Sequence, residues 1–371
     1  MKIGYDAKRA FHNTTGLGNY SRWLIKIIAE FYPDNKLYLC TPKDKQTSFT
    51  EFIKQHINIH VLTAAQKPLK WLWRSRGVVN DLKQEGVNLY HGLSHELPFS
   101  IARSGIKTIV TVHDVIVLRN PELFGKINAA IYTFKLKHAC KTADKILAIS
   151  KKTADDLIEL LRIDPKKIKV IYQGADEVFK QPANMERDET ARVKYNLPEK
   201  YLLSVGTVEE RKNLMLTVKA LTQVPDIPLV VVGRQTCYAE KVKEYALQND
   251  LSHRIIFLEN VTFTELPSIY RQAEILIYPS RYEGFGLPVL EALYSGTPVI
   301  AATGSCLEEA GGPGSMYITP DDEDALADNI NELLTDEPLR QNMISEGKKY
   351  AQKFDDAKLA EQLIDIYREI V

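Results

Sequence analysis

The sequence predicts an α/β protein built from two doubly wound parallel sheets. Short apolar runs alternate with amphipathic, helix-like stretches along most of the 371 residues, which is the pattern of repeated βαβ units. A polar, proline-punctuated stretch (180–200) interrupts this alternation and separates two groups of expected strands. The length suits about two domains of ordinary size. We therefore expect two Rossmann-like domains that face each other across a cleft, with ligands at the carboxyl ends of the strands.

The first group of strands defines an expected N-terminal domain, residues 1–180. Its strands are KIGYD (2–6), KLYLC (36–40), INIHVL (57–62), VNLYHG (87–92), IKTIVTV (106–112), KILAIS (145–150) and IKVIYQG (168–174). After them comes KQPANMERDETARVKYNLPEK (180–200), which is charged and interrupted by proline. We expect this segment to be a linker.

The second group defines an expected C-terminal domain, residues 181–350. Its strands are YLLSVG (201–206), PLVVVG (228–233), RIIFL (254–258), EILIYP (274–279), PVIAA (298–302) and SMYIT (315–319). From about residue 321 the chain becomes helical, because LADNINELL and LAEQLIDIYREI show a 3.6-residue apolar period. We expect the last helix, residues 351–371, to cross back to the N-terminal domain.

The composition excludes several classes of protein. Lysine plus arginine and aspartate plus glutamate balance at 48 each, which argues against a nucleic-acid binder driven by bulk charge. The cysteines (Cys40, Cys140, Cys237 and Cys306) are scattered, so neither a disulfide framework nor a zinc site is expected. The N-terminus runs directly into a strand, and no apolar run approaches the ~18 residues that span a bilayer. We expect a cytoplasmic protein, at most peripheral to a membrane.

The most informative segment is the loop that follows the expected strand EILIYP. Gly284 and Gly286 can adopt positive φ and leave room for a ligand, and Pro288 suits the first position of a helix. A helix N-terminus presented in this way attracts an anion. Glu283 and Glu291 flank the anion site, and carboxylates beside a phosphate are favourable only where they face other groups, such as hydroxyls. A ligand that carries both phosphate and hydroxyl groups is a nucleotide sugar.

An isolated E-x₇-E pattern also fits an ordinary strand-loop-helix with two solvated glutamates. The full string EGFGLPVLEALYSGTPVI, however, closely resembles the signature of the retaining glycosyltransferases of family 4, which have the two-domain GT-B fold. The resemblance covers nearly the whole chain and is strongest across residues 201–312. It implies that Glu283 holds the sugar hydroxyls and Glu291 the ribose. The implied donor-binding residues of this loop are Glu283, Gly284, Phe285, Gly286, Leu287 and Glu291.

Two adjacent cations follow the first strand of the expected C-terminal domain. Arg211 and Lys212 combine a rigid fork with a point charge, which suits a diphosphate, although such a pair is often a solvated helix start. The segment resembles the family's G-T-L-E-P-R-K-N, whose Arg and Lys hold the donor diphosphate. Many members carry Arg where this chain has Thr207, so one phosphate contact is in doubt. Charge stabilisation by these cations would replace a metal, and we expect neither a metal nor another cofactor.

Other acidic pairs do not form a D-x-D metal motif. Asp321-Asp322 and Asp355-Asp356 are interpreted as helix caps or surface charge. The family's F-S-W near the C-terminus appears here as Phe354-Asp355-Asp356, which puts the usual tryptophan packing of the last helix in doubt.

The N-terminal half contributes three further segments. Gly16 and Gly18 lie in TTGLGNY, which resembles the family's TGIGRY loop, where glycines let backbone N–H groups approach the donor phosphate. His113 lies in HDVIVLRNPELF, which resembles a family segment whose His faces the donor sugar. It is a candidate for bonding a sugar hydroxyl or passing the acceptor's proton. His95 and Glu96, in HGLSHELP, are candidates for the acceptor site.

Two basic, aromatic segments suggest a membrane-facing surface. Residues 52–80 contain no acidic side chain and include KPLKWLWRSRG, and residues 123–143 are likewise free of acids. If Trp71–Arg76 and Lys126–Lys141 formed one face, it would attract anionic lipid at ~1 kcal/mol per basic residue. The alternative is that both are packed amphipathic helices with ordinary solvated lysines.

The function implied by the resemblance is retaining transfer of a hexosyl group to a glycan or lipid-linked acceptor in surface polysaccharide biosynthesis. Mannose from GDP-mannose is the first choice of donor, because TGLGNY and GTVEERKN look most like mannosyltransferase members; a UDP-sugar is the second. His113, Arg211, Lys212 and Glu283 are the candidate catalytic residues. The departing phosphate oxygen would take the acceptor's proton, so that no glycosidase-like carboxylate pair is needed.

Two alternatives belong to other classes. A noncatalytic nucleotide-sugar-binding subunit of a glycan synthesis complex would be expected to have lost a donor-site residue, yet all those named above are present. A dinucleotide-dependent dehydrogenase needs G-x-G-x-x-G after its first strand, and residues 16–21 (GLGNYS) lack the third glycine.

Overall fold

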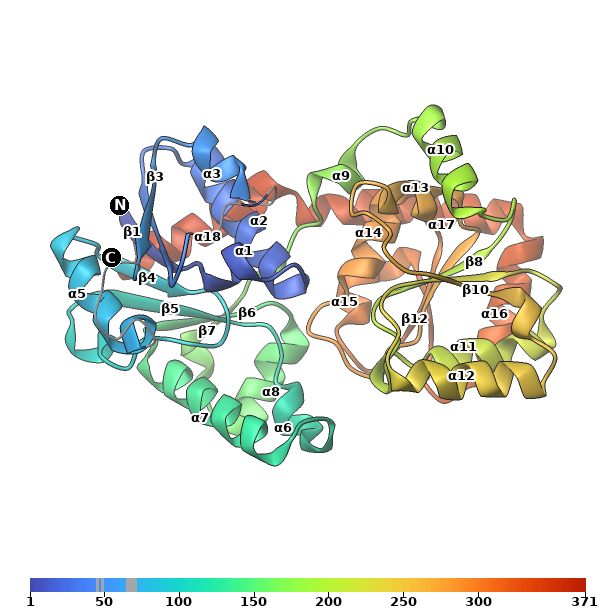
Figure 1. The fold of residues 1–371 in the computed structure, drawn as a ribbon, viewed down its shortest axis with the longest axis horizontal. Coiled ribbons are helices and arrows are strands. Elements are labelled where there is room, and N and C mark those ends of the chain that lie inside the picture. The colour runs from blue at the N-terminus through green and yellow to red at the C-terminus, as the bar shows by residue number, and fades with distance from the viewer. Residues whose placement is uncertain (45–46, 48–49, 65–71) are drawn as a thin grey trace. The chain divides into compact units, whose positions relative to one another are not determined.

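The computed structural model describes residues 1–44, 47, 50–64 and 72–371. The chain divides into two compact units, and the second is inserted into the first. Unit 1 comprises Met1–Gly174 together with Phe354–Val371, and unit 2 comprises Ala175–Lys353. Each unit is a parallel sheet with helices on both faces, which confirms the predicted α/β class with two doubly wound sheets (Figure 1).

The sheet of unit 1 has the strand order β3-β2-β1-β4-β5-β6-β7. Its strands are β1 (Lys2–Asp6), β2 (Lys36–Thr41), β3 (Ile59–Thr63), β4 (Leu89–Gly92), β5 (Lys107–Val112), β6 (Lys145–Ala148) and β7 (Ile168–Val170). All neighbouring strands run parallel; Ile3 of β1, for example, lies opposite Leu37 of β2 and Leu89 of β4. Every strand expected in this half of the sequence is present. The order reverses between β1 and β4, which is where such sheets bind ligands.

The helices of unit 1 connect these strands and cover the sheet. They are α1 (Lys8–His12), α2 (Gly16–Phe31), α3 (Phe52–Gln55), the π-helical turn η2 (Trp73–Gly77), α5 (Val78–Gln84), η3 (Ile101–Arg103), α6 (Ile116–Arg119), η4 (Pro121–Leu123), α7 (Lys126–Thr142), α8 (Lys151–Leu161), η5 (Pro165–Lys167) and α18 (Asp356–Ile370). The core between β4–β6, α5 and α7 is apolar, with Val110, Leu136 and Ile146 fully buried.

The sheet of unit 2 has the strand order β10-β9-β8-β11-β12-β13 and reverses between β8 and β11. Its strands are β8 (Leu202–Val205), β9 (Leu229–Val232), β10 (Ile255–Leu258), β11 (Ile275–Tyr278), β12 (Val299–Ala302) and β13 (Met316–Ile318). They coincide with the six runs that the sequence predicts. Continuous burial of β9, β11 and β12 explains why these runs are apolar throughout and do not alternate.

The helices of unit 2 include the one that follows the glycine loop, α14. The set is α9 (Glu177–Lys180), α10 (Met185–Tyr195), η6 (Glu210–Lys212), α11 (Leu214–Ala220), η7 (Leu221–Gln223), α12 (Cys237–Gln248), η8 (Ser252–Arg254), α13 (Leu266–Gln272), α14 (Leu287–Ser295), α15 (Leu307–Gly311), η9 (Gly312–Gly314), α16 (Glu323–Thr335), α17 (Glu337–Ala351) and η10 (Gln352–Phe354).

The prediction of a linker over residues 180–200 is wrong in part, because residues 185–195 form the helix α10. Asn184 caps this helix by accepting a hydrogen bond from the Arg187 amide at 3.0 Å. Asp188 holds it against α13 through Arg271 Nε (3.0 Å) and through its own carbonyl, which accepts from Gln272. Polar contacts attach this helix, and of its own residues only Ala191 is buried, so apolar periodicity could not reveal it.

The last helix, α18, is part of unit 1. Tyr367 is fully buried, and its hydroxyl lies 2.7 Å from Nδ1 of His91. Phe354 is also fully buried and packs edge-on against Tyr172 of the same unit.

The second aspartate of the pair at the start of α18 is not a surface charge. Asp355 caps the helix as expected, because its carboxylate accepts from the Ala357 amide at 3.1 Å. Asp356, in contrast, is buried and accepts a hydrogen bond from Trp23 Nε1 of α2 at 2.8 Å. This bond ties the end of the chain to its beginning.

We expect Asp356→Ala to lower the free energy of unfolding of unit 1 by about 1–3 kcal/mol, because it leaves the buried indole N–H unpaired. The three tryptophans of the sequence, Trp23, Trp71 and Trp73, all belong to unit 1, so urea unfolding followed by tryptophan fluorescence reports on this unit. Asp365→Ala is the control, since Asp365 is exposed on the same helix. Equal stability of the two variants would contradict the prediction.

Candidate functional site

The glycine loop joins β11 to α14 at the point where the sheet of unit 2 reverses. Gly286 caps α14 with φ of 111°, and a Cβ there would lie 2.7 Å from a side-chain methyl of Leu307. Glycine is therefore required both by the backbone angle and by the space. The helix begins at Leu287, one residue before the proline that was expected to open it.

The short helix η6 brings the two expected cations to the same place. Asn213 caps the C-terminus of η6, has a left-handed φ of 60° and is buried. The side-chain amide Nδ2 of Asn213 donates to the carbonyl of Pro279 at 3.2 Å and to that of Pro320 at 2.7 Å. The carbonyl of Arg211 accepts from the Arg281 amide at 2.9 Å. These bonds fix the segment after β8 against the loop after β11.

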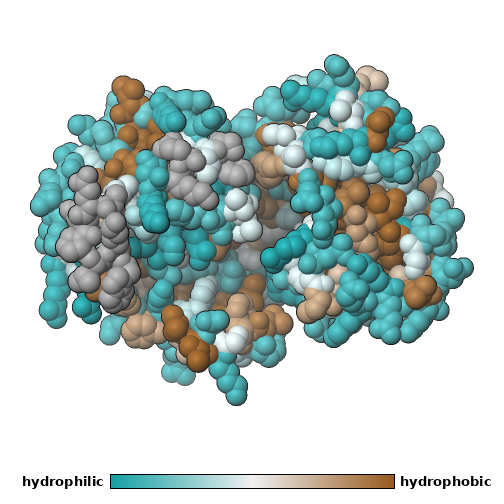
Figure 2. Space-filling view, in the orientation of Figure 1, coloured by the Kyte–Doolittle hydropathy of each residue, from teal (hydrophilic) through white to brown (hydrophobic). Residues whose placement is uncertain are grey.

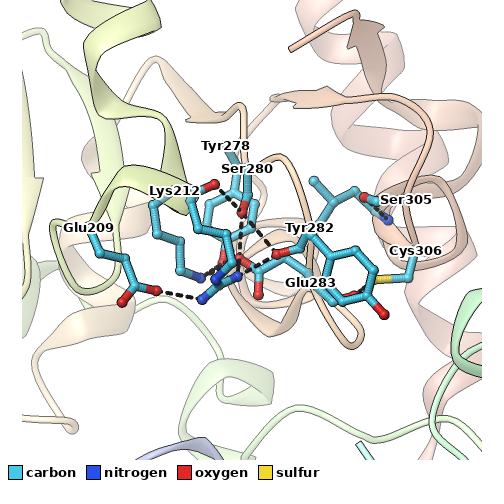
Figure 3. A network of polar contacts seen from close by, with 10 residues as sticks. Glu209, Lys212, Tyr278, Ser280, Tyr282, Glu283, Ser305 and Cys306 are labelled. Atoms are coloured by element: carbon cyan, nitrogen blue, oxygen red, sulfur yellow. Dashed lines mark hydrogen bonds and ion pairs between the residues drawn. The ribbon is translucent and has the colours of Figure 1, made fainter. Parts of the chain in front are cut away.

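Glu283 lies at the centre of the resulting cluster (Figure 3). Its Oε1 accepts from Lys212 Nζ at 2.5 Å and pairs with Nη1 of Arg211 at 2.9 Å. The hydroxyls of Ser280 and Tyr278 donate to the same oxygen at 2.7 and 3.0 Å. Burial alone would raise the pKa of Glu283, but the two cations lower it to about 2. The carboxylate is therefore ionised at every ordinary pH.

Arg211 has a second carboxylate partner. Its Nη2 lies 2.6 Å from Glu209, and its Nη1 also donates to the carbonyl of Tyr282. Burial opposes the charged guanidinium, yet Glu283 and Glu209 together hold the pKa of Arg211 above its usual range. The thiol of Cys306, at the start of α15, donates to the carbonyl of Glu283 at 3.1 Å. Arg211 is thus kept charged and is held in place.

Glu291 lies in a different environment from Glu283. It projects from α14, is 9% exposed, and accepts a hydrogen bond from the Tyr270 hydroxyl at 2.8 Å. Burial raises its pKa to about 7. The two glutamates of the E-x₇-E pattern therefore differ in charge near neutral pH: Glu283 is ionised, whereas Glu291 is poised between its two forms.

The two candidate histidines of unit 1 bond to each other and to the backbone. His113 Nε2 lies 2.8 Å from the carbonyl of Leu93, so it must donate, which leaves Nδ1 able to accept a hydrogen bond but not to donate one. His95 Nε2 accepts from the His113 amide at 2.7 Å, so its proton lies on Nδ1, 2.7 Å from the Tyr132 hydroxyl. Burial lowers the pKa of both rings to about 3, and both are neutral.

Glu96 lies between two cavities of unit 1. Its carboxylate pairs with Arg74 at 2.7 Å and with Lys135 at 3.2 Å. One cavity, of about 560 Å³, is also lined by Lys8 and Phe99. The other, of about 180 Å³, is lined by residues that include Arg9, Ser94, His95, Asp114, Phe124 and Tyr132. The structure thus brings His95 and Glu96 together at the smaller cavity.

The remaining expected donor residues have more ordinary surroundings. Gly18 lies in the first turn of α2, and its amide donates to the Asn13 side chain at 3.1 Å. A Cβ on Gly18 would lie 1.9 Å from the Asn13 carbonyl, so local packing by itself requires glycine there. Gly16 begins α2 and has open space around it. Thr207 follows β8 and is half-buried.

The first basic, aromatic segment does not form the expected surface. Trp71 lies outside the described residues. Trp73 is buried, with its Nε1 donating to Asp81 at 2.8 Å, and Arg74 pairs with Asp6 at 2.6 Å. The expectation is therefore wrong for Trp73, which is buried and bonded to Asp81, and for Arg74, whose charge is neutralised by Asp6. Among the described residues, no helix is both long and apolar enough to cross a membrane.

Sequence reasoning missed four residues of the cluster and its supports. Tyr278 and Ser280 donate to Glu283, Tyr270 donates to Glu291, and Asn213 fixes the loop. Two of them, Tyr278 and Ser280, lie in the YPSRYEG string directly before the glutamate. Their hydroxyls next to a carboxylate were the available signal.

Comparisons with known protein families agree on both halves of the chain. Residues 186–350 match the model "Glycosyl transferases group 1", and residues 24–179 match "Glycosyltransferase Family 4". The O-antigen chain mannosyltransferase RfbU of Salmonella typhimurium is 30% identical over 247 residues, which cover 66% of this chain and 65% of that protein. The O-antigen chain mannosyltransferase B of Escherichia coli is 27% identical over 99% of this chain and 100% of its own length.

Solved structures with the same fold cover the whole chain. Anabaena HepE, in a complex with UDP and glucose, has a TM-score of 0.77 at 20% identity and covers 100% of both chains. WaaG, a glycosyltransferase involved in lipopolysaccharide biosynthesis, has a TM-score of 0.72 at 18% identity over 99% of both chains. At these identities the likeness shows the fold, which is GT-B as expected.

We expect the stability of unit 2 to depend on the protonation of Glu291. Because its folded-state pKa lies above the ordinary value of 4.5, Glu291 adds stability below about pH 4.5 and loses that contribution as the pH rises through about 7. Relative to Glu291→Gln, the wild type should therefore lose about 3 kcal/mol of unfolding free energy between pH 4.5 and 8. Calorimetric unfolding across this range measures the difference.

The matched control is Glu244→Gln, because Glu244 is exposed on α12 of the same unit. Its difference from the wild type should stay constant with pH. A constant difference for Glu291→Gln as well would show that Glu291 titrates like a solvated glutamate.

Proposed function

The chain belongs to the group 1 glycosyltransferases of family 4, and we propose that it is a retaining mannosyltransferase of surface polysaccharide biosynthesis. The donor would be a nucleotide diphosphate sugar, and the acceptor a glycan or a lipid-linked glycan. The observation that carries this proposal is the cluster of Arg211, Lys212 and Glu283 at the carboxyl end of the sheet in unit 2. It combines cations for a diphosphate with a carboxylate for hydroxyl groups within one loop pair.

In the proposed complex, Arg211 and Lys212 bind the diphosphate next to the N-terminus of α14. Glu283 accepts hydrogen bonds from the sugar hydroxyls, and Glu291 accepts from the ribose. Negative charge grows on the leaving diphosphate as its bond to the sugar breaks, so cations at this place stabilise the transition state more than the ground state. Two half-buried cationic side chains supply this stabilisation, and we propose that transfer needs no metal.

The proposed reaction balances without a covalent enzyme intermediate. The bond between the anomeric carbon and the phosphate oxygen breaks, and a bond from the acceptor oxygen forms on the same face. The acceptor's proton passes to the departing phosphate oxygen, so the products are the mannosylated acceptor and a nucleoside diphosphate. His113 would accept a hydrogen bond from a sugar hydroxyl through Nδ1, since its other nitrogen donates to Leu93. Positioning and charge then carry the catalysis.

GDP-mannose is the proposed donor because both curated relatives described above are named mannosyltransferases of the O-antigen chain. A UDP-sugar is the second candidate, since structures of HepE contain UDP and UDP-glucose. For the acceptor, the cavities beside Glu96 and His95 in unit 1 offer carboxylate, cation and aromatic groups, a combination that suits a sugar.

We further propose that α7 attaches the protein to anionic lipid at the inner face of the membrane. Its side chains Ile127, Ile131 and Phe134 recur at helical spacing and are 78%, 50% and 63% exposed. Leu123 and Phe124 extend this apolar stripe, and Figure 2 shows hydrophobic side chains where α6 and α7 lie. Exposed lysines at 126, 137 and 141 accompany it without any acidic residue between 123 and 143. An apolar stripe flanked by cations is typical of interfacial helices.

The test of the proposed activity is to incubate the pure protein with GDP-mannose and, separately, with UDP-sugars. Release of the nucleoside diphosphate is followed with and without excess EDTA. We expect slow donor hydrolysis that persists in EDTA, because Arg211 and Lys212 already supply the charge. Activity that EDTA abolishes and Mg²⁺ or Mn²⁺ restores would refute metal independence.

Variants of the cations sharpen this test. Arg211→Ala and Lys212→Ala should each lower kcat by about 10²-fold or more. Lys243→Ala removes an exposed lysine of α12 that pairs with Glu240 and lies over the Phe257 ring, and it should leave kcat unchanged. Unchanged kcat in the first two variants would show that the diphosphate binds elsewhere.

The membrane proposal predicts co-sedimentation with phosphatidylserine vesicles at low salt and its loss as salt screens the lysines. Replacing both Ile127 and Phe134 by serine should abolish binding. Leu247→Ser is the control, since Leu247 is 72% exposed on unit 2. Equal recovery in the supernatant with neutral and anionic vesicles would contradict a lipid-facing α7.

A further inference from the structure

The cations of the donor site are already neutralised by the chain itself. Lys212 Nζ and Arg211 Nη1 converge on a single oxygen of Glu283, at 2.5 and 2.9 Å. The hydroxyls of Ser280 and Tyr278 donate to that same oxygen. Four donors therefore surround one anionic oxygen, as they would surround an oxygen of a bound phosphate (Figure 3). Glu283 occupies the place that the proposed diphosphate needs.

Because the cluster is largely buried, separating Glu283 from its cations is electrostatically unfavourable. The side chains of Glu283, Arg211 and Lys212 are 12%, 17% and 18% exposed. Glu283 cannot become neutral between pH 5 and 9, because its pKa is about 2. A diphosphate that takes both cations would therefore leave the Glu283 carboxylate with only the Ser280 and Tyr278 hydroxyls, without a cation and beside a second anion. Buried charge in that state is strongly unfavourable unless other donors replace the cations.

Only ligands that carry sugar hydroxyls as well as phosphates can supply hydrogen-bond donors to Glu283. A nucleotide sugar brings phosphate oxygens for Arg211 and Lys212 and also hydroxyl groups for Glu283. A nucleoside diphosphate without the sugar brings the phosphates alone. With the donor bound, the cations pair with the phosphates and Glu283 pairs with the sugar hydroxyls. With the nucleoside diphosphate bound, the cations still pair with the phosphates, but Glu283 has no ligand group in place of the cations.

We propose that Glu283 is a resident competitor of the diphosphate, which makes the site select ligands that carry both a diphosphate and a sugar and which helps to expel the nucleoside diphosphate after transfer. This inference rests on the proposed function, because it assumes that the cluster binds the donor. When the donor binds, its phosphates replace Glu283 at the cations, and its hydroxyls hydrogen-bond to the freed carboxylate. When the sugar has left, Glu283 recovers Arg211 and Lys212 and displaces the product.

A second carboxylate nearby provides a matched control. Glu209 also pairs with Arg211, at 2.6 Å, but its side chain is 39% exposed, whereas Glu283 lies between both cations and is 12% exposed. Glu209→Gln and Glu283→Gln change the net charge of the site equally. They differ in whether the removed anion occupies the shared position between both cations. A simple effect of net charge would be the same in the two variants.

The experiment is calorimetric titration of the wild type, Glu283→Gln and Glu209→Gln with inorganic pyrophosphate, GDP, UDP and GDP-mannose. We expect Glu283→Gln to bind pyrophosphate and the preferred nucleoside diphosphate about tenfold more tightly or better, because glutamine does not compete for cations. Its affinity for the nucleotide sugar should rise much less, so that the preference for the sugar-bearing ligand falls. Glu209→Gln should change all of these affinities by a smaller and similar factor.

Three outcomes would overturn the proposal or separate it from the proposed function. Pyrophosphate binding that is no tighter in Glu283→Gln would refute the competition, and equal tightening in both variants would reduce it to net charge. If neither the wild type nor Glu283→Gln binds pyrophosphate or any nucleotide, the cations are not a diphosphate site and the proposed function fails as well. Should Glu283→Gln be less stable, the increase in its Tm with pyrophosphate must still exceed that of the wild type.

Discussion

The buried charge balance between Glu283 and its two cations is the constraint on which the site of unit 2 depends. Arg211 and Lys212 follow β8, and Glu283 follows β11, so the cluster joins the two strands at which the sheet order reverses. At that reversal the connections leave in opposite directions and open a space for a ligand. The ion pairs close this space with the chain's own groups. Removing one partner would leave uncompensated charge, so the cluster holds both loops in register.

The strands and the glycine loop could be predicted from sequence because their causes are local. Strands such as β9, β11 and β12 are short apolar runs that are buried throughout, and Gly286 needs a positive φ that glycine alone adopts readily. The roles of Arg211, Lys212 and Glu283 as one group came from a family resemblance, and the structure places them in direct contact. Spacing alone could not have brought the two segments together, since about 70 residues separate them in sequence.

The parts that sequence could not predict depend on partners that are distant along the chain. Arg74 looks like part of an exposed basic, aromatic segment, but Asp6, 68 residues away, binds it. Asp356 looks like a helix cap, but Trp23 donates to it. The helix α10 lacks an apolar stripe and is held by polar contacts. In each example the local pattern is ambiguous, and one specific hydrogen bond or ion pair decides the structure.

The candidate site residues of the two units differ in their ability to exchange protons near neutral pH. In unit 1, burial lowers the pKa of the His95 and His113 rings to about 3, so neither ring takes up a proton at neutral pH. Glu96 is likewise held by Arg74 and Lys135. Titratable capacity near pH 7 lies instead with Glu291 of unit 2. A proton leaving an acceptor hydroxyl therefore finds no ready base among the histidines, which is why a route to the departing phosphate suits the proposed reaction better than a histidine relay.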